Sequence, residues 1–490
     1  MKKGFKVPKS VSYVTETLEK GGFEAYLIGG CVRDLVTGRR PNDWDVTTNA
    51  TPEQIIKLFP KTFYENEYGT VGVVNENEID ETLKIIEVTP YRIEANYSDF
   101  RRPDEVKFSG KLEDDLSRRD FTINAIAFSV SKGQIIDPYK GRDDIKDKII
   151  RAVGEPENRF NEDALRILRA VRLATELGFK IEEKTEKSIK KSTFLLEKMS
   201  FERIRDEFVK IVMSNNPKAG IEMAHDLGVL EYIVPETEKG LHVKQNGDHI
   251  YDVWEHNLRA LQHSADNAWP LHVRLAALFH DVSKPETRRW DEAKKDYTFY
   301  GHDVVGSRVT RKIMERLKFP VKLVDTVSKL VRYHLFFSDV DKITLSAVRR
   351  IVSNVGPENV WDLMKVRACD RIGMGRPKEK PYRLRKYEAM IEEAMRAPVS
   401  VGMLKTDGAK VMEVTHETPG PRIGWILHAL LEDVLDDPNL NTDKYLNKRT
   451  LELSKMSDTE LKKFGVAGKD KKEEKEAEEV GEIRKRHWVK

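Results

Sequence analysis

The sequence has few of the features that mark secreted or membrane proteins. Its 490 residues include only two cysteines, Cys31 and Cys369, which are far apart in sequence. Two distant cysteines exclude a disulfide framework and indicate a reducing cytosol. No apolar run follows the N-terminal methionine, so we expect no signal peptide, and no stretch approaches the roughly 18 uninterrupted apolar residues of a membrane span. We therefore expect a cytoplasmic protein with no membrane association.

The sequence also lacks a strong net charge. Charged residues make up 34% of the chain, yet the formal net charge is only +3. A protein of this balance that binds a polyanion must gather its lysines and arginines on one face, which leaves acidic clusters for catalysis or metals. The length is enough for roughly three domains at about 150 residues each.

The chain changes character near residue 150. Before that point, short apolar runs that end at turn residues predict strands at 25–28, 45–48, 72–74 and 83–88, with a short helix at 52–59. After it, apolar residues recur at helical spacing, as in 163–177, 182–198 and 201–213, and nearly everything to about residue 465 reads as helix. The last 23 residues are dominated by Lys and Glu, which predicts a disordered or solvated helical tail.

A double-glycine turn follows the first predicted strand. Gly29 and Gly30 let the backbone come close to a ligand, and the N–H groups at the following helix start favour phosphate. Arg33, one turn into that helix, can add a guanidinium to the same anion. A plain turn is the alternative interpretation.

Two carboxylates follow at a spacing of two. Asp43 and Asp45 enter a predicted strand at positions i and i+2, so both are expected on one face. Two adjacent anions repel unless a cation lies between them. A pair of Mg²⁺ ions would relieve the repulsion and would also serve an in-line displacement by a 3′-hydroxyl. An Asp-rich surface turn is the alternative for the pair in isolation.

Together these segments resemble a known family. Gly29–Asp34 with Asp43-Trp44-Asp45 is similar to the signature of bacterial CCA-adding enzymes and poly(A) polymerases, a branch of the polymerase-β-like nucleotidyltransferases. The segments 118–125 and 162–166 resemble, respectively, the family's ribose- and triphosphate-binding motif and its base-reading motif. The resemblance implies an α+β fold, with a mixed-sheet nucleotidyltransferase head and flanking helices, followed by an all-helical neck, body and HD domain. It also implies Glu87 as a third catalytic carboxylate and these nucleotide-binding residues: Gly29, Gly30, Arg33, Arg119, Asp120, Asn124, Asp163, Arg166, Arg169 and Arg172.

Asp163 and Arg166 have a chemical reason to select bases. If they share a helix face, Arg166 can donate and Asp163 can accept hydrogen bonds at the same base. Cytosine and adenine offer an acceptor beside a donor on their Watson–Crick edge and so match this pair. Uracil and guanine offer the reverse order and do not match it. A surface ion pair is the alternative interpretation. Arg169 and Arg172 continue the stripe and could equally bind RNA phosphates or lie in solvent.

A second cluster lies in the helical body. An adjacent His-Asp pair and three further histidines offer ligands that suit Mn²⁺, Ni²⁺, Fe²⁺ or Zn²⁺. Their order resembles the HD phosphohydrolases. That resemblance implies His256, His280, Asp281 and Asp370 as metal ligands, and His302 and His334 as ligands of a possible second metal. Satisfied core histidines are the alternative.

These observations predict a template-independent enzyme that adds CCA to the tRNA 3′ end from CTP and ATP, with a possible HD phosphohydrolase activity. The expected domains are a head (1–150), a neck (151–239), an HD domain (240–375), a helical region that contacts tRNA (376–465) and a charged tail (466–490). The resemblance implies contacts with the tRNA acceptor stem and elbow. The oligomeric state stays open.

Three alternatives remain from the sequence. A-only addition and poly(A) tailing share the same head motifs. Residues 68–73 resemble the CCA branch, and the full loop from Tyr91 to Arg118, with Arg101-Arg102-Pro103, is similar to the loop that the family needs for A addition. A regulatory nucleotidyltransferase–HD signalling protein is a different class, which would need no motif that selects C and A.

Overall fold

The computed structural model describes residues 5–64, 69–95, 105–247, 249–335, 343–396 and 401–489. The chain divides into two compact units, the first of residues 1–334 with 365–377 and the second of residues 335–364 with 378–490. The tip of the expected A-addition loop, including Arg101-Arg102-Pro103, lies outside the described residues, as does Tyr68.

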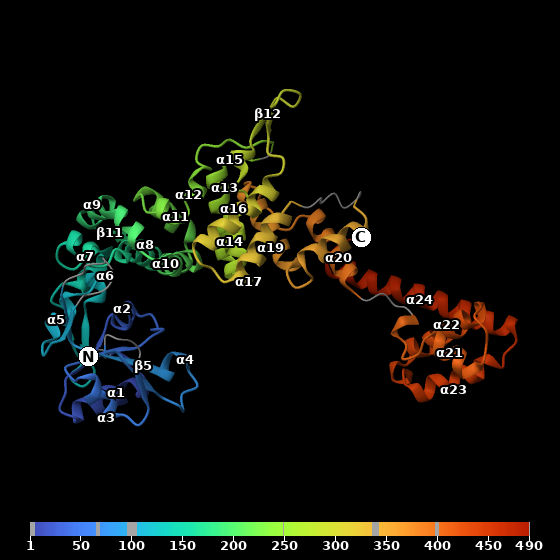
Figure 1. Ribbon diagram of the computed structural model, residues 1–490, viewed down its shortest axis with the longest axis horizontal. Coiled ribbons are helices and arrows are strands. Elements are labelled where there is room, and N and C mark those ends of the chain that lie inside the picture. The colour runs from blue at the N-terminus through green and yellow to red at the C-terminus, as the bar shows by residue number, and fades with distance from the viewer. Residues whose placement is uncertain are drawn as a thin grey trace. The chain divides into compact units, whose positions relative to one another are not determined.

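The head of the first unit is built on a seven-stranded mixed sheet with strand order β3-β4-β5-β2-β1-β8-β9 (Figure 1). β2 and β5 pair in parallel, whereas the other neighbours are antiparallel. The strands are β1 (Ala25–Ile28), β2 (Asp45–Thr48), β3 (Thr62–Tyr64), β4 (Val71–Val74), β5 (Ile85–Pro90), β8 (Ala127–Ser129) and β9 (Gln134–Ile136). The two-stranded pairs are β6 (Arg92–Ala95) with β7 (Glu105–Phe108) and β10 (Ile149–Ile150) with β11 (Lys180–Ile181).

Short helices flank this sheet. They are α1 (Lys9–Lys20), α2 (Gly30–Thr37), α3 (Pro52–Leu58), α4 (Glu81–Lys84), α5 (Leu112–Ser117), the 3₁₀ turn η1 (Thr122–Asn124) and α6 (Gly141–Asp147). α1 buries Val11, Val14 and Leu18 at the three and four spacing of an amphipathic helix. α3 starts with a capping box in which Thr51 and Gln54 satisfy each other's backbone N–H groups. The expected α+β head is confirmed.

Helices make up most of the remainder of the first unit. The neck contains α7 (Pro156–Glu162), α8 (Leu165–Leu177), α9 (Glu183–Ser192), η2 (Thr193–Lys198), α10 (Phe201–Met213), α11 (Pro217–Asp226), η3 (Leu230–Tyr232) and α12 (Pro235–Glu238). The HD region follows with α13 (Val253–Asp266), α14 (Leu271–Phe279), α15 (Lys284–Thr287), α16 (His302–Arg316), α17 (Val321–Tyr333) and α19 (Val360–Gly373).

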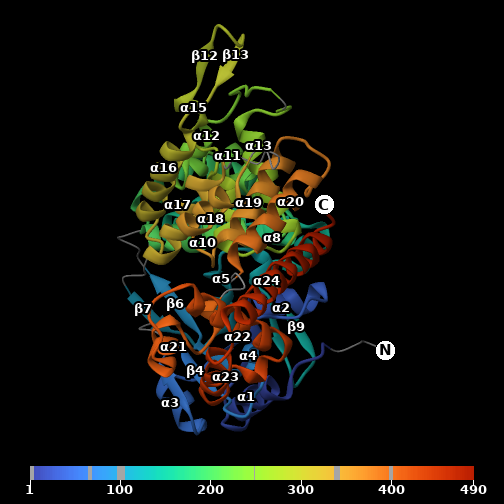
Figure 2. The same cartoon turned by 90° about the vertical axis from the view of Figure 1, so that its right-hand side faces the viewer.

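A β-hairpin interrupts the HD region, where the sequence predicted helix. β12 (Arg289–Asp291) and β13 (Asp296–Thr298) pair with each other in antiparallel register. The aromatic and β-branched residues Trp290, Tyr297 and Thr298 favour strand over helix. Lys295 takes a positive φ of 51° in the turn between them. Figures 1 and 2 both show the hairpin extending beyond α15.

The second unit is helical throughout its described residues. It contains α18 (Leu345–Val355), α20 (Tyr382–Met395), η4 (Val401–Met403), α21 (Gly408–Thr415), α22 (Pro421–Asp436), η5 (Pro438–Leu440), α23 (Asp443–Ser454) and α24 (Asp458–Arg486). α22 and α24 pack closely at two glycines: a Cβ on Gly465 would lie 2.7 Å from the Trp425 Cα, and one on Gly468 2.2 Å from the His428 carbonyl oxygen.

The charged segment after residue 465 is helical as far as Arg486, so the disordered alternative is wrong for these residues. Lys and Glu are good helix formers, and Ser457 starts α24 with a capping box. The segment is also held by partners, because Arg396 donates to Glu479 at 2.9 Å and the buried Ile483 packs with Ala389.

Two other boundaries differ from the prediction. Leu83 lies in α4 and not in a strand, because the Asp80 side chain accepts from the Thr82 N–H and starts a helical turn that delays β5 to Ile85. The helix expected from Asp163 begins at Leu165, with consequences for the site described below.

Candidate functional sites

The double-glycine turn joins β1 to α2 as predicted. Gly29 has φ 77° and is the N-cap of α2, and its carbonyl accepts the Arg33 N–H at 3.2 Å. A Cβ on Gly29 would lie 2.9 Å from an Arg119 Nη1 and 3.6 Å from the Asp45 Oδ2. Glycine is thus required both by the backbone angle and by the space. The turn brings a helix N-terminus, a guanidinium and a carboxylate to one place.

Asp45 and Glu87 are neighbours in the sheet. Asp45 is the first residue of β2 and is the register partner of Glu87 on the parallel strand β5. Partners in such a pair lie on the same face, so both carboxylates share it. Asp43 lies in the bend before β2, so it does not reach this face through strand alternation, as the sequence argument assumed.

Electrostatics shows that Asp43 and Asp45 are nonetheless close. Burial raises the pKa of Asp45 from its ordinary 3.8 to about 6; the Arg119 guanidinium acts to lower it, and the Asp43 carboxylate raises it further. A pKa raised this far means that too little positive charge lies near Asp45 to stabilise its ionised form. A divalent cation supplies one, so the donor set fits the predicted metal pair.

Arg119 is held by a buried acid. Asp115 is fully buried and accepts from Arg118 Nη2 at 2.5 Å and Arg119 Nη2 at 3.2 Å. Burial acts to raise the pKa of Asp115, but the two guanidinium groups outweigh it, and the pKa lies below its ordinary value. The buried Nε of Arg119 has no hydrogen-bond partner. Arg119 therefore has donor capacity left for an anion above Gly29.

Four of the predicted nucleotide-binding residues form one network. Arg33 Nη1 donates to Asn124 Oδ1 at 3.0 Å, and Asn124 Nδ2 donates to Asp120 Oδ1 at 3.2 Å. Arg169 of α8 closes the chain with a 2.6 Å ion pair to Asp120 Oδ2. Burial acts to raise the pKa of Asp120, but Arg169 outweighs it and holds the pKa far below its usual range. The network connects the glycine turn with the neck.

The base-reading pair is arranged differently from the prediction. Asp163 lies in the break between α7 and α8, where its Oδ1 accepts the Leu165 N–H at 3.1 Å. This local bond competes with helix and delays α8 by two residues. Asp163 and Arg166 therefore do not share one helix face: Asp163 pairs with Arg203 at 2.8 Å and Arg166 with Glu162 at 2.6 Å.

Arg166 and Arg172 are engaged with protein groups. Arg166 is only 9% exposed, and its Nη2 also donates to the Arg118 carbonyl at 2.9 Å. Arg172 pairs with Glu207 of α10 at 2.5 Å and with Glu176 at 2.8 Å. The structure thus joins Arg166 to the Arg118–Ala125 motif, whereas Arg172 links α8 to α10.

The predicted His–Asp residues of the HD region form one buried cluster. We call it the His–Asp cluster: His256, His280, Asp281, His302, His334 and Asp370, each at most 6% exposed. Asp281 is central. Its Oδ2 lies 3.0 Å from His256 Nε2 and 3.3 Å from His280 Nε2, and its Oδ1 lies 3.2 Å from His302 Nε2 and 3.5 Å from His334 Nε2. The Asp370 Oδ1 lies 3.4 Å from His256 Nε2.

The ring orientation in this cluster suits a metal. His280, His302 and His334 each place Nδ1 within 2.6–2.8 Å of the backbone carbonyl three residues before. A carbonyl can only accept, so each Nδ1 carries a proton and each Nε2 faces the cluster; in a neutral ring this Nε2 is the atom that would bind a metal. The buried Nε2 atoms of His302 and His334 have no hydrogen-bond partner. Imidazoles oriented in this way around a carboxylate have the arrangement in which histidines bind a metal ion, so the residues fit the predicted metal site.

Two members of this region were missed from the sequence. His249 groups with His256, Asp281 and Asp370 as one set of potential ligands, while His302 and His334 share Asp281 in another. Lys284 Nζ lies 2.6 Å from Asp281 Oδ2. Lys284 could have been found from its spacing of three after Asp281, whereas His249 sits in an irregular segment that carries no periodic signal.

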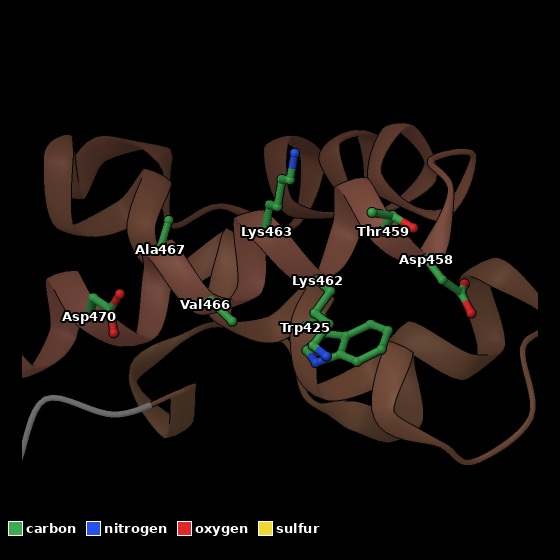
Figure 3. Close-up of a pocket in the computed structure, with 8 residues that line it drawn as sticks. All are labelled: Trp425, Asp458, Thr459, Lys462, Lys463, Val466, Ala467 and Asp470. Atoms are coloured by element: carbon green, nitrogen blue, oxygen red, sulfur yellow. The ribbon is translucent and has the colours of Figure 1, made fainter.

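The second unit has a surface hollow that shares no residue with either cluster. It is lined by residues of α22 and α24: Trp425, Asp458, Thr459, Lys462, Lys463, Val466, Ala467 and Asp470 (Figure 3). Among the described residues, no helix has both the length and the apolar character needed to cross a bilayer.

Three segments of the chain match known family models. Residues 25–151 match the poly A polymerase head domain, residues 178–241 the "Probable RNA and SrmB- binding site of polymerase A", and residues 248–370 the HD domain. The chain thus carries a poly(A) polymerase-type nucleotidyltransferase head, an RNA-binding segment and an HD domain.

Its curated relatives are CCA-adding enzymes. The chain is 48% identical to that of Lactobacillus helveticus over 44% of this chain and 53% of the relative. It is 40% identical to the CCA-adding enzyme of Lactobacillus johnsonii, over 56% of this chain and 66% of the relative. The chain therefore spans about half to two thirds of the length of these relatives.

Solved structures of CCA-adding enzymes are also similar to this chain. The Bacillus stearothermophilus CCA-adding enzyme in complex with CTP is 28% identical with a TM-score of 0.60, covering 91% of this chain and 98% of that one. The Thermotoga maritima CCA-adding enzyme, complexed with tRNA, shares the fold at 18% identity and a TM-score of 0.50, with 91% and 96% covered. The resemblance to CCA-adding enzymes expected from the motifs is confirmed.

Proposed function

We propose that this protein adds CCA to the 3′ end of tRNA, using CTP and ATP. The observation that carries the proposal is the juxtaposition of Asp45, Glu87 and Arg119 around the Gly29 turn. This arrangement places acidic metal ligands and an incompletely bonded guanidinium at a helix N-terminus. The names of the relatives supply the nucleotide sequence that is added.

Each residue of the head has a part in this reaction. Asp43 and Asp45 would hold two Mg²⁺ ions, with Glu87 as the third carboxylate; the ions supply the charge that activates a 3′-hydroxyl and neutralises the leaving pyrophosphate. The N–H groups of the Gly29-Gly30 turn and Arg119 bind triphosphate oxygens.

The Arg33–Asn124–Asp120–Arg169 network orients the nucleotide's sugar and phosphates. Its members hold one another at 2.6–3.2 Å, so each side chain is fixed before the nucleotide arrives. Groups fixed in advance lower the entropy cost of positioning the reactants.

Asp163 and Arg166 select the base. Their position supports this role, because Arg166 acts on the pKa of Asp120 and Asp163 acts on that of Arg169, so both lie beside the nucleotide network. Arg166 presents donors and Asp163 acceptors, which suits the Watson–Crick edges of C and A and leaves U and G unsatisfied.

The His–Asp cluster supports a second activity, the hydrolysis of a phosphoester. It would hold one or two transition metal ions, which supply a hydroxide nucleophile. The reaction adds the water oxygen to phosphorus, breaks one P–O ester bond and leaves the proton on the departing oxygen. Asp281 would be shared between the two ligand sets, and Lys284 provides a positive charge beside it.

One assay tests the main proposal. The full chain is incubated with Mg²⁺, tRNA lacking its 3′ triplet, and each NTP alone or in combination, and the tRNA ends are sequenced. We expect CCA from CTP with ATP and no extension with UTP or GTP. Addition of a single A to tRNA ending in CC, with no C addition, would show an A-only enzyme. A long A tract would show poly(A) tailing, and labelling of protein or free nucleotide in place of tRNA would show the signalling alternative.

A further inference from the structure

The β12–β13 hairpin has exposed aromatic side chains that the fold does not use. Trp290 is 50% exposed, and Tyr300, two residues after β13, is 75% exposed. In the sheet pairings of the described residues, these two strands bond only to each other (Figure 2). Burial of apolar surface therefore does not explain these aromatic residues.

Three planar groups contact one another along one face of the hairpin. Trp290 and Tyr297 are register partners whose rings lie 5.1 Å apart in edge-to-face contact. The Arg288 guanidinium lies 3.5 Å from the centre of the Tyr297 ring, and its buried Nε has no hydrogen-bond partner. Exposed aromatic rings beside a guanidinium are the groups that contact the bases and phosphates of single-stranded nucleic acids.

The charge of the hairpin fits the same ligand. The segment 288–300 contains four cationic and three acidic residues. Two of the acids are bonded to backbone amides: Asp291 accepts from the N–H groups of Ala293 and Lys294, and Asp296 accepts from Gly247. The two arginines stand at the base of the hairpin, at the start of β12, whereas Glu292 lies in the turn at its far end.

The base of the hairpin is connected to the His–Asp cluster by direct contacts. Phe299 follows β13, its carbonyl holds the His302 ring at 2.6 Å, and its own ring lies 5.6 Å from Lys284 Nζ. Lys284 in turn is paired with Asp281. The Gly247 N–H bond to Asp296 also ties the hairpin to the segment that carries His249.

We propose that the hairpin binds the terminal nucleotides of a single-stranded RNA and presents the terminal phosphate to the His–Asp cluster. The bases stack on the exposed Trp290 ring, and Arg288 contacts the backbone. This inference rests on the proposed hydrolytic function and adds the element that binds the RNA part of the substrate, the β12–β13 hairpin.

The kinetic test compares two substrates of the Mn²⁺-loaded full chain: a hexanucleotide with a 2′,3′-cyclic phosphate and bis(p-nitrophenyl) phosphate. We expect Trp290→Ala to lower the ratio of kcat/KM for the hexanucleotide over the small diester roughly tenfold, mainly through KM, since stacking contributes that much per base. Trp290→Tyr should restore most of it. Trp488→Ala, a control at an 80% exposed tryptophan of the second unit, should leave the ratio unchanged. An unchanged ratio in Trp290→Ala overturns the proposal.

A binding test separates this inference from the hydrolysis itself. RNA hexamers with a terminal 4-thiouridine are photocross-linked to wild type and the linked peptide is identified by mass spectrometry. We expect linkage within 288–300 and its loss in Trp290→Ala. Hydrolysis of both substrates without such linkage overturns the role of the hairpin and keeps the hydrolase. Linkage without any hydrolysis refutes the hydrolytic function and with it the presentation of a phosphate to the cluster.

Discussion

Replacing Asp45 with Asn should stabilise the metal-free protein while abolishing nucleotide addition. Burial raises the pKa of Asp45 from 3.8 to about 6, with Arg119 lowering it and Asp43 raising it. In the folded state the carboxylate therefore binds a proton more tightly than in the unfolded chain. Between these two pH values the folded state holds more protons, so stability falls as the pH rises from about 4 to 6 and stays lower above that range.

The magnitude follows from the shift. About two pKa units at 1.36 kcal/mol each give an upper value of about 3 kcal/mol, and we expect ~1–3 kcal/mol of destabilisation at pH 7.5 in wild type relative to Asp45→Asn. Mg²⁺ should remove much of this difference in stability between wild type and Asp45→Asn, because a bound cation stabilises the ionised carboxylate. Incorporation of CTP should fall by more than a hundredfold, since a metal ligand is lost.

Thermal and urea unfolding in EDTA from pH 4.5 to 8, followed by the same series in Mg²⁺, measures the effect. Asp144→Asn is the matched control: this buried acid accepts from Thr122 and Arg151, so its replacement should destabilise the protein. If Asp45→Asn lowers the melting temperature in EDTA at pH 7.5, the carboxylate is held by protein partners and the argument for a vacant positive partner is wrong. Full nucleotide addition by the variant would place the catalytic carboxylates elsewhere.

Three further predictions concern the base selector, the second centre and the C-terminal packing. Arg166→Ala should reduce the preference for CTP and ATP over UTP and GTP by about 1–3 kcal/mol, roughly ten to a hundredfold in relative kcat/KM, whereas an equal loss for all four would refute selection. His280→Ala should remove Mn²⁺-dependent hydrolysis of a cyclic phosphate but keep CCA addition; loss of both would contradict independent centres. Gly468→Ala should lower the melting temperature of the second unit, because its Cβ would meet the His428 carbonyl at 2.2 Å, while Gly481→Ala, with open space, should not.

The sequence predicted the bounds of an element well where the residues themselves mark its two ends. The strands 25–28 and 45–48 and the helix Phe201–Met213 were predicted with the observed bounds. The first is a short apolar run that ends at the Gly29-Gly30 turn, the second contains three consecutive β-branched residues, and the third is a long amphipathic pattern. Leu83 shows where this fails: an apolar residue at a strand-like position entered a helical turn because Asp80 capped it.

The hairpin and His249 were not predicted, for a related reason. Three-residue strands are too short for alternation to show, and a histidine in an irregular segment has no periodicity to place it. Asp163 shows a further reason. Its spacing predicted a position in a helix, but its side chain accepts a hydrogen bond from the Leu165 N–H and Asp163 lies before the helix starts. Spacing therefore predicted the residue types of the proposed base selector but not their arrangement.

In both clusters, the charges around a central carboxylate decide whether its ionised form is stable without a metal ion, and the two clusters differ in the outcome. In the head, Asp45 is buried beside a second acid and a single incompletely engaged arginine, so its charged form is disfavoured. In the HD region, Lys284 and the imidazoles surround Asp281, and although burial acts to raise its pKa, His280 and Lys284 hold it well below the ordinary value. Asp281 thus keeps its charge without an ion, whereas Asp45 needs one. Metal occupancy should accordingly change the stability of the head more than that of the HD region.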